Sequence, residues 1–234
     1  MSWNQQPSTM TADVRDARIS AFLGRVYAWM FLGLLVTTGT AFVVASTPVL
    51  IETLILNRPL LWILLFGQLG LVWYLSARVK DMSPTTAGVL FMIYSASVGV
   101  TTSVVLLLYT GVSLVSTFVV TAGMFGSLAL FGTFTKRSLA GIGQFMFMGL
   151  IGLVIALVVN IFLQNDALDF VICVVGVIVF TGLTAWDAQR MKQMAVALPD
   201  GRVGAFAIVG ALRLYLDFIN LFLFLLRFLG GRRN

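Results

Sequence analysis

The chain has 234 residues, of which 59% are hydrophobic and only 10% are charged, and it carries a formal net charge of +6. Its mean hydropathy of +1.01 lies far above the range of soluble globular domains, so the composition excludes a soluble enzyme and indicates an integral membrane protein. The basic excess is typical of residues that flank membrane-spanning helices and set their orientation, and we therefore expect the lipid bilayer and no nucleic acid as a partner.

Seven segments are long and apolar enough to cross a bilayer, because a spanning helix needs about 20 mainly apolar residues. In chain order they cover approximately residues 26–46, 60–77, 87–109, 114–134, 142–163, 168–187 and 205–229. Apolar material recurs along the whole chain and the connections are short, so we expect neither a signal peptide nor a separate soluble domain. The predicted fold class is an all-α polytopic membrane protein. It has a polar cytoplasmic tail over residues 1–24, a seven-helix domain over residues 25–231 and a short tail over residues 232–234.

Small residues at four-residue spacing predict close approach between some of these helices, as is common in membranes. The pattern occurs three times, at Ser95 and Gly99, at Ala122 and Gly126, and at Gly152 and Ala156. The lone cysteine, Cys173, lies in an apolar run and cannot form a disulfide within the chain, so we interpret it as a packing residue.

Basic residues near the predicted spans favour a cytoplasmic N-terminus, since cytoplasmic loops are enriched in Lys and Arg. They gather before the first segment and after the second, fourth and sixth segments, at Arg15, Arg18, Arg25, Arg78, Lys80, Lys136, Arg137, Arg190, Lys192 and Arg202. Seven spans then place the C-terminus outside, where Arg232 and Arg233 run against the rule. A last segment that enters the membrane and turns back is the alternative.

Two carboxylates inside apolar segments are the strongest functional candidates. Asp217 lies within the apolar stretch 204–231, and Asp187 ends the preceding one. An ionised group at the centre of a spanning helix costs about 2.5–3.5 kcal/mol on insertion scales, so such residues usually face the bundle interior or a water-filled path. We expect the two acids to meet and share a proton, and so to respond to pH although the chain has no histidine.

Ion pairing is the alternative explanation of these acids. Arg213 precedes Asp217 by four residues on one helix face, and Asp187 has Arg190 and Lys192 close by in sequence. Three further polar residues, Asn160, Asn220 and Thr184, either join the acid site or form hydrogen bonds between helices, and we favour the hydrogen bonds. Two carboxylates alone would form a weak, transient Ca²⁺ site, which suits a conduction path, and we expect no cofactor.

Three stretches closely resemble the Bax inhibitor-1 family, also called the transmembrane Bax inhibitor motif family. They are TKRSLAGIGQFMFMGLIGLVIALVVNIFL (135–163), VFTGLTAWDAQRMK (179–192) and LYLDFINLFLFLLRFLG (214–230). The resemblance implies a seven-helix fold whose last helix is surrounded by the other six. It also implies a pH-sensitive Ca²⁺ leak with Asp187 and Asp217 as the proton-sharing sensor, and a basic latch at the end of the second helix, where Arg78 is the nearest match.

The short loops and tails resemble those of a bacterial member in the cytoplasmic (inner) membrane. The first functional hypothesis is therefore a cation leak, chiefly of Ca²⁺, controlled by protonation. The second is a regulatory protein that restrains a membrane-embedded quality-control protease. An intramembrane aspartyl protease ranks last because Asp217 lacks a Gly-x-Gly-Asp context, and we expect no enzymatic activity.

Overall fold

The structure is a computed structural model that describes residues 12–199, 202–231 and 233, and the regular elements in these ranges are all helical. Seven long helices within them are apolar enough to cross a membrane, which confirms the predicted all-α polytopic fold. These helices are α1 (Ala12–Ser46), α3 (Arg58–Arg78), α4 (Pro84–Leu108), α5 (Gly111–Phe134), α6 (Ala140–Leu163), α7 (Asp166–Ala197) and α8 (Val203–Leu229). Two short turns, α2 (Pro48–Leu50) and η1 (Ile51–Ile55), connect α1 to α3.

Two helices extend well beyond the spans predicted from hydropathy. α1 begins at Ala12 inside the predicted tail, and α7 continues to Ala197 past Asp187. Both extensions still bury one face, with Ile19 and Phe22 buried on α1 and Met191 on α7. Hydropathy marks where the hydrocarbon ends, whereas helical hydrogen bonding and packing continue into the charged region.

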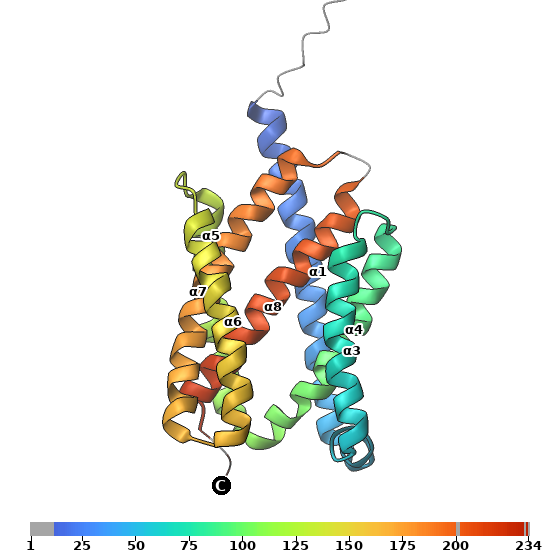
Figure 1. Ribbon diagram of the computed structural model, residues 1–234. Helices are drawn as coiled ribbons and strands as arrows, with labels where there is room; N and C mark the ends of the chain where they lie inside the picture. Colours follow the sequence, from blue (N-terminus) through green and yellow to red (C-terminus); the bar gives the residue numbers. More distant parts are fainter. Residues whose placement is uncertain (1–11, 200–201, 232, 234) are drawn as a thin grey trace, which may run out of the picture.

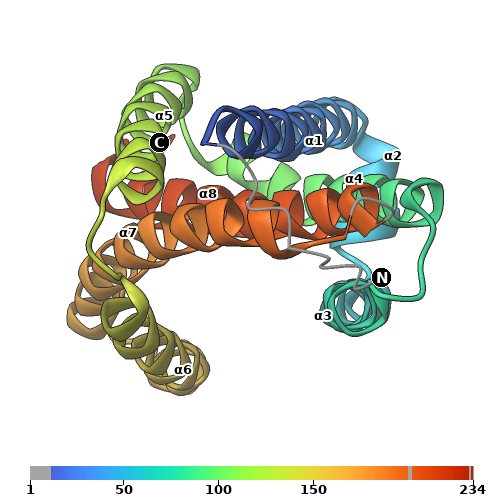
Figure 2. The same cartoon turned by 90° about the horizontal axis from the view of Figure 1, so that it is seen from above.

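The helices form three layers, and α8 lies in the middle one. Figure 2 shows α1 and α5 on one side, α3 and α6 on the other, and α4, α8 and α7 between them. α8 is the most buried of the described helices, with 67% of its apolar window inside the bundle. It packs directly against α1, α4, α5 and α7, while α3 packs mainly on α4 and α6 on α7. The resemblance implied a surround of six helices, and four of them make most of the direct contact.

α1 and α4 approach each other most closely where α4 carries a small residue. A Cβ atom at Gly99 would lie 2.6 Å from the backbone oxygen of Thr37, so only glycine allows this approach, and Ser95 is fully buried beside it. The predicted pair Ser95 and Gly99 is therefore a packing motif. The other two predicted motifs are wrong as close contacts, because Gly126 and Gly152 face open space. Four-residue spacing alone does not say which face of a helix meets a neighbour.

The C-terminal end of the chain lies at the opposite end of the bundle from the start of α1 (Figure 1). α8 runs without a break to Leu229, and the residues after it bond to the connection between α4 and α5. Arg233 donates its backbone N–H to Leu108 (2.9 Å), and Gly231 donates its own to Ser113 Oγ (2.9 Å). The alternative of a final segment that turns back is therefore wrong.

Candidate functional site

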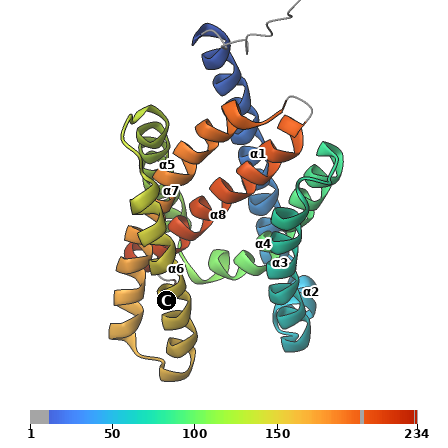
Figure 3. The same cartoon turned by 45° about the horizontal axis from the view of Figure 1, so that its top comes forward.

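A cavity of about 460 Å³ opens on the side of α8 that faces α3 and α6. Figure 3 shows α8 crossing behind the space between these two helices. The walls are mostly apolar, and a few polar side chains converge on one part, which is the usual composition of a small-ligand site. The polar side chains, together with the indole of Trp186, come from α3, α7 and α8. They are Ser76, Trp186, Asp187, Arg213, Asp217 and Asn220.

Asp187 and Asp217 both line this cavity, so α7 and α8 bring the two predicted acids to one site. Both residues are buried, with 7% and 5% of their surface exposed. One oxygen of each carboxyl group, Oδ1 of Asp187 and Oδ2 of Asp217, is buried without a hydrogen-bond partner. A buried and unpartnered carboxylate oxygen is costly, so each of these oxygens needs a proton, a water molecule or a cation as its partner.

Arg213 is the basic residue of the site, and its partner differs from the one that helical spacing suggested. Its Nη1 lies 4.0 Å from Oδ1 of Asp187 on α7. This distance permits Coulomb attraction but is too long for a hydrogen bond. Oδ1 of Asp187 therefore has no hydrogen-bond partner. The guanidinium side chain is 37% exposed and lines the cavity. Arg213 therefore bridges α8 to α7 across the cavity, in place of the predicted pairing with Asp217 along α8.

The other cations near Asp187 in sequence bind elsewhere. The guanidinium of Arg190 lies over the ring of Trp186 at 5.6 Å. Lys192 donates from Nζ to the backbone oxygen of Thr133 at the end of α5 (2.8 Å). Among the described residues, neither Arg190 nor Lys192 therefore forms a close ion pair with Asp187, as the alternative explanation required.

Among the predicted supporting residues, Asn220 lines the cavity and Thr184 does not. Asn220 donates from Nδ2 to the backbone oxygen of Leu216 (2.8 Å), which leaves its amide oxygen available to the cavity. Thr184 is fully buried and donates to Phe180 (2.7 Å) within its own helix. Both hydroxyl and amide thus bond along their own helices, and the favoured interpretation as bonds between helices is wrong for these two contacts.

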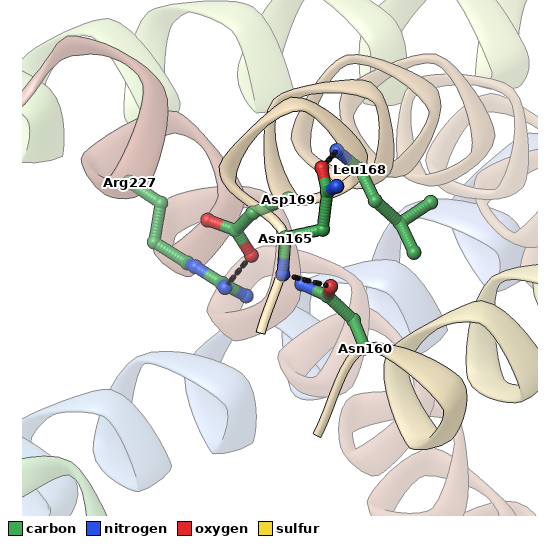
Figure 4. A network of polar contacts seen from close by, with 5 residues as sticks. All are labelled: Asn160, Asn165, Leu168, Asp169 and Arg227. Atoms are coloured by element: carbon green, nitrogen blue, oxygen red, sulfur yellow. Dashed lines mark hydrogen bonds and ion pairs between the residues drawn. The ribbon is translucent and has the colours of Figure 1, made fainter. Parts of the chain in front are cut away.

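Two predicted residues lie outside the cavity. Asn160 is at the end of α6, where its Oδ1 accepts the backbone N–H of Asn165 (3.1 Å), as Figure 4 shows. The same figure shows the neighbouring ion pair between Asp169 and Arg227, which joins α7 to α8 at the far end of the bundle. Arg78 is exposed and lies 3.8 Å from Asp81 on the connection after α3. In this arrangement Ser76 is the polar residue of α3 that lines the cavity.

The described residues contain no group of three or more Asp, Glu, Cys or His side chains placed to hold a metal ion. Ca²⁺ takes six to eight oxygen ligands, and the two acids with Asn220 and Ser76 would supply part of such a shell. Water would have to supply the remainder. This incomplete set of oxygen ligands suits a cation that binds briefly better than one that is permanently bound.

Sequence reasoning missed the contact that holds α8 against α1 and α4. The hydroxyl oxygen of Tyr215 lies 2.6 Å from Oγ1 of Thr37, and the Tyr215 ring packs edge-on against Phe91 and Tyr94. Tyr215 is two residues from Asp217 and lies on another face of α8. A tyrosine within an apolar segment was the available signal, because a buried tyrosine hydroxyl needs a partner.

Comparison with known proteins identifies the family of this chain. Residues 19–234 match the family described as inhibitor of apoptosis-promoting Bax1. Inner membrane protein YbhL of Escherichia coli K12 is 46% identical over 220 residues, which cover 93% of this chain and 94% of YbhL. An uncharacterized protein of Borreliella burgdorferi is 40% identical over 91% of this chain and 93% of its own length. The chain therefore belongs to the Bax inhibitor-1 family, as the resemblance of its acid-bearing segments predicted.

Proposed function

We propose that this protein is a pH-sensitive leak pathway for cations, chiefly Ca²⁺, in a bacterial inner membrane. In this proposal Asp187 and Asp217 act as one proton sensor, and their oxygens offer a transient binding point to the passing ion. The observation that carries the proposal is that both carboxyl groups line one cavity and each has a buried oxygen without a hydrogen-bond partner. The proposal needs no cofactor and gives the acids no catalytic role.

Repulsion between the two acids drives gating in this proposal. Two ionised carboxylates repel each other strongly in a medium of low dielectric constant, and one shared proton removes that repulsion. The shared proton would therefore favour the close packing of α7 on α8. Its loss would shift the population towards bundles in which the two helices separate.

Between the acids and the start of α8, the seam between α7 and α8 is apolar and tightly packed. Ile208 and Leu212, which precede Asp217 on α8, are buried. Gly210 lies against Met191 of α7, so closely that a Cβ atom there would meet the methionine sulfur at 2.5 Å. In the proposal, an ion passes when α7 and α8 move apart along this apolar seam.

The test is Ca²⁺ flux into liposomes that contain only this protein, measured across pH. Asp187→Asn and Asp217→Asn each replace a titrating acid by a neutral amide of similar size, so each should flatten the pH dependence. The double variant should do little more than either single one, because coupled groups act as a unit. Asp166→Asn is the matched control, since Asp166 is an exposed acid at the far end of α7 and should leave the profile unchanged.

Two results would contradict the proposal. If the native protein passes no cation at any pH, the leak function is wrong, and restraint of a membrane protease becomes the function to test by copurification. If either single variant keeps the native pH profile, that aspartate is not part of the sensor.

A further inference from the structure

A second cavity lies on the opposite side of α8 from the acids. Its volume is about 370 Å³, and α1, α4, α5 and α8 line it. We call it the α1–α5 groove, because α1 and α5 form its two rims and make little direct contact with each other. Phe218, Ile219 and Phe222 of α8 form its floor.

The groove opens to the outside of the bundle at membrane depth. Three of its lining residues are strongly exposed, namely Leu35 of α1 (52%) and Val115 (66%) and Phe118 (46%) of α5. Both rims belong to helices that span the membrane, so the medium at the opening is hydrocarbon.

The few polar groups in the groove are already satisfied. Thr37 Oγ1 shares its hydrogen between the carbonyl oxygens of Gly33 and Ser95 and contacts the Tyr215 hydroxyl. Thr38 and Thr102 each donate to a carbonyl oxygen one turn earlier in their own helices. Water enters a cavity only where polar groups can bind it, and none of these hydroxyls lacks a partner. The groove is therefore suited to an alkyl chain and not to water.

A cationic residue lies near one end of the groove. The groove reaches Leu106 of α4 and Leu114 of α5, so the connection between these helices closes that end. Two residues after α8 lie on this connection: Gly231 accepts the backbone N–H of Thr110 (3.3 Å), and Arg233 donates its own to Leu108 (2.9 Å). Arg233 is exposed, and a positive charge at this end of an alkyl-chain site matches the phosphate of a lipid headgroup.

We propose that the α1–α5 groove binds one acyl chain of an anionic phospholipid from the leaflet at the α4–α5 end, with its phosphate beside Arg233. The bound chain fills the space between α1 and α5 and presses on the floor formed by α8. It thereby supports the helix that carries Asp217 from the side opposite the acids. This site is independent of the cation-leak proposal, because binding is measured without flux.

The test is native mass spectrometry of the purified protein titrated with phosphatidylglycerol, and with phosphatidylcholine of the same chains. The native protein should retain one phosphatidylglycerol and bind phosphatidylcholine more weakly. Thr38→Phe fills the groove from its α1 rim and should weaken phosphatidylglycerol binding by about tenfold, equivalent to about two methylenes kept out of the groove. Val43→Phe adds a similar bulk at an exposed site of α1 outside the groove and should bind as the native protein does.

Two further variants complete the test. Val115→Phe blocks the α5 rim, so the experiment does not depend on Thr38→Phe folding. Arg233→Gln should reduce the preference for phosphatidylglycerol over phosphatidylcholine and leave the bound chain in place. Retention of the lipid by both groove-filling variants would overturn the site. Equal binding of the two lipids by the native protein would overturn the phosphate contact. If the native protein is a dimer and Thr38→Phe abolishes the dimer, a second copy of the chain is the occupant of the groove.

Discussion

At the scale of single residues, α8 presents different chemistry on different faces. Asp217 and Arg213 face the cavity with Asp187, whereas Tyr215 lies against Thr37 of α1. One helix thus carries both the candidate sensor and the anchor that sets its position. The two roles are separable by substitutions that change one group and keep the size of the side chain.

We expect Arg213→Gln to move the midpoint of pH-dependent flux to higher pH by about one unit. A cation 4.0 Å from Asp187 favours the ionised acids, so its removal lets them keep their shared proton to higher pH. The shift should be small because a separation of 4.0 Å is too long for a hydrogen bond. Arg25→Gln, which removes an exposed cation on α1, is the control. A midpoint that stays the same in Arg213→Gln would show that this contact does not act on the acids.

We expect Tyr215→Phe to lower the free energy of unfolding by about 1 kcal/mol, the usual effect of one lost buried hydrogen bond. The aromatic ring and its edge-on packing remain, and only the 2.6 Å contact with Thr37 disappears. Thermal unfolding in detergent measures the change. Tyr74→Phe makes the same chemical change at an exposed site on α3 and should have little effect. Equal unfolding temperatures for the two variants would contradict an anchoring role of the Tyr215 hydroxyl.

At the scale of helices, α7 connects the site to the rest of the bundle. It packs against α5, α6 and α8, and its Gln189 accepts the backbone N–H of Leu139 and donates to the carbonyl of Arg137. The connection between α5 and α6 is thus bonded to α7 two residues after Asp187. Movement of α7 away from α8 would carry α5 and α6 with it.

We expect Gly132→Ala to destabilise the protein by about 1–3 kcal/mol, as overpacking commonly does. Gly132 of α5 lies so close to α7 that a Cβ atom would collide with the carbonyl group of Ala185. Gly123→Ala on the same helix is the control, because that position faces open space and alanine favours a helix by about 1 kcal/mol over glycine. Thermal unfolding followed by circular dichroism should therefore give a lower unfolding temperature for Gly132→Ala and a higher one for Gly123→Ala. Destabilisation by both substitutions would mean that the α5–α7 approach is not the cause.

At the scale of the whole molecule, the two ends of the bundle differ in charge. The end where α1 begins carries the basic residues at the ends of α3, α5 and α7. At the opposite end the described acids Glu52, Asp166 and Asp169 are matched by Arg58, Arg227 and Arg233. Because cytoplasmic loops are enriched in Lys and Arg, this asymmetry predicts that the end where α1 begins faces the cytoplasm.

We expect single cysteines, introduced in a Cys173→Ala background, to label from opposite sides of the membrane. Cysteine at position 136 should react from the cytoplasm, and cysteine at position 166 or 233 should react only from outside. The prediction for position 233 follows from the contact of Arg233 with Leu108 at the far end of the bundle. Labelling of position 166 from the cytoplasm alone would reverse the orientation.

The sequence by itself determined the fold class, the seven spans, the family and the two acids. Each of these follows from a local property, namely apolar length, a charge within an apolar run, or a contiguous motif such as LYLDFINLFLFLLRFLG. It misplaced the start of α1 and the end of α7, because hydropathy records the bilayer boundary and not the end of helical packing.

Only the tertiary structure decided which residues meet. Helix rotation placed Arg213 toward Asp187 on α7 although Asp217 is its neighbour on α8, and it turned Gly99 into a tight contact while Gly126 faces open space. Asn160 and Arg78 lie outside the cavity for the same reason, since their position depends on how α6 and α3 sit against α7 and α4. Rotation and spacing of helices depend on long-range contacts between distant segments, and a period of 3.6 residues read along one segment does not contain them.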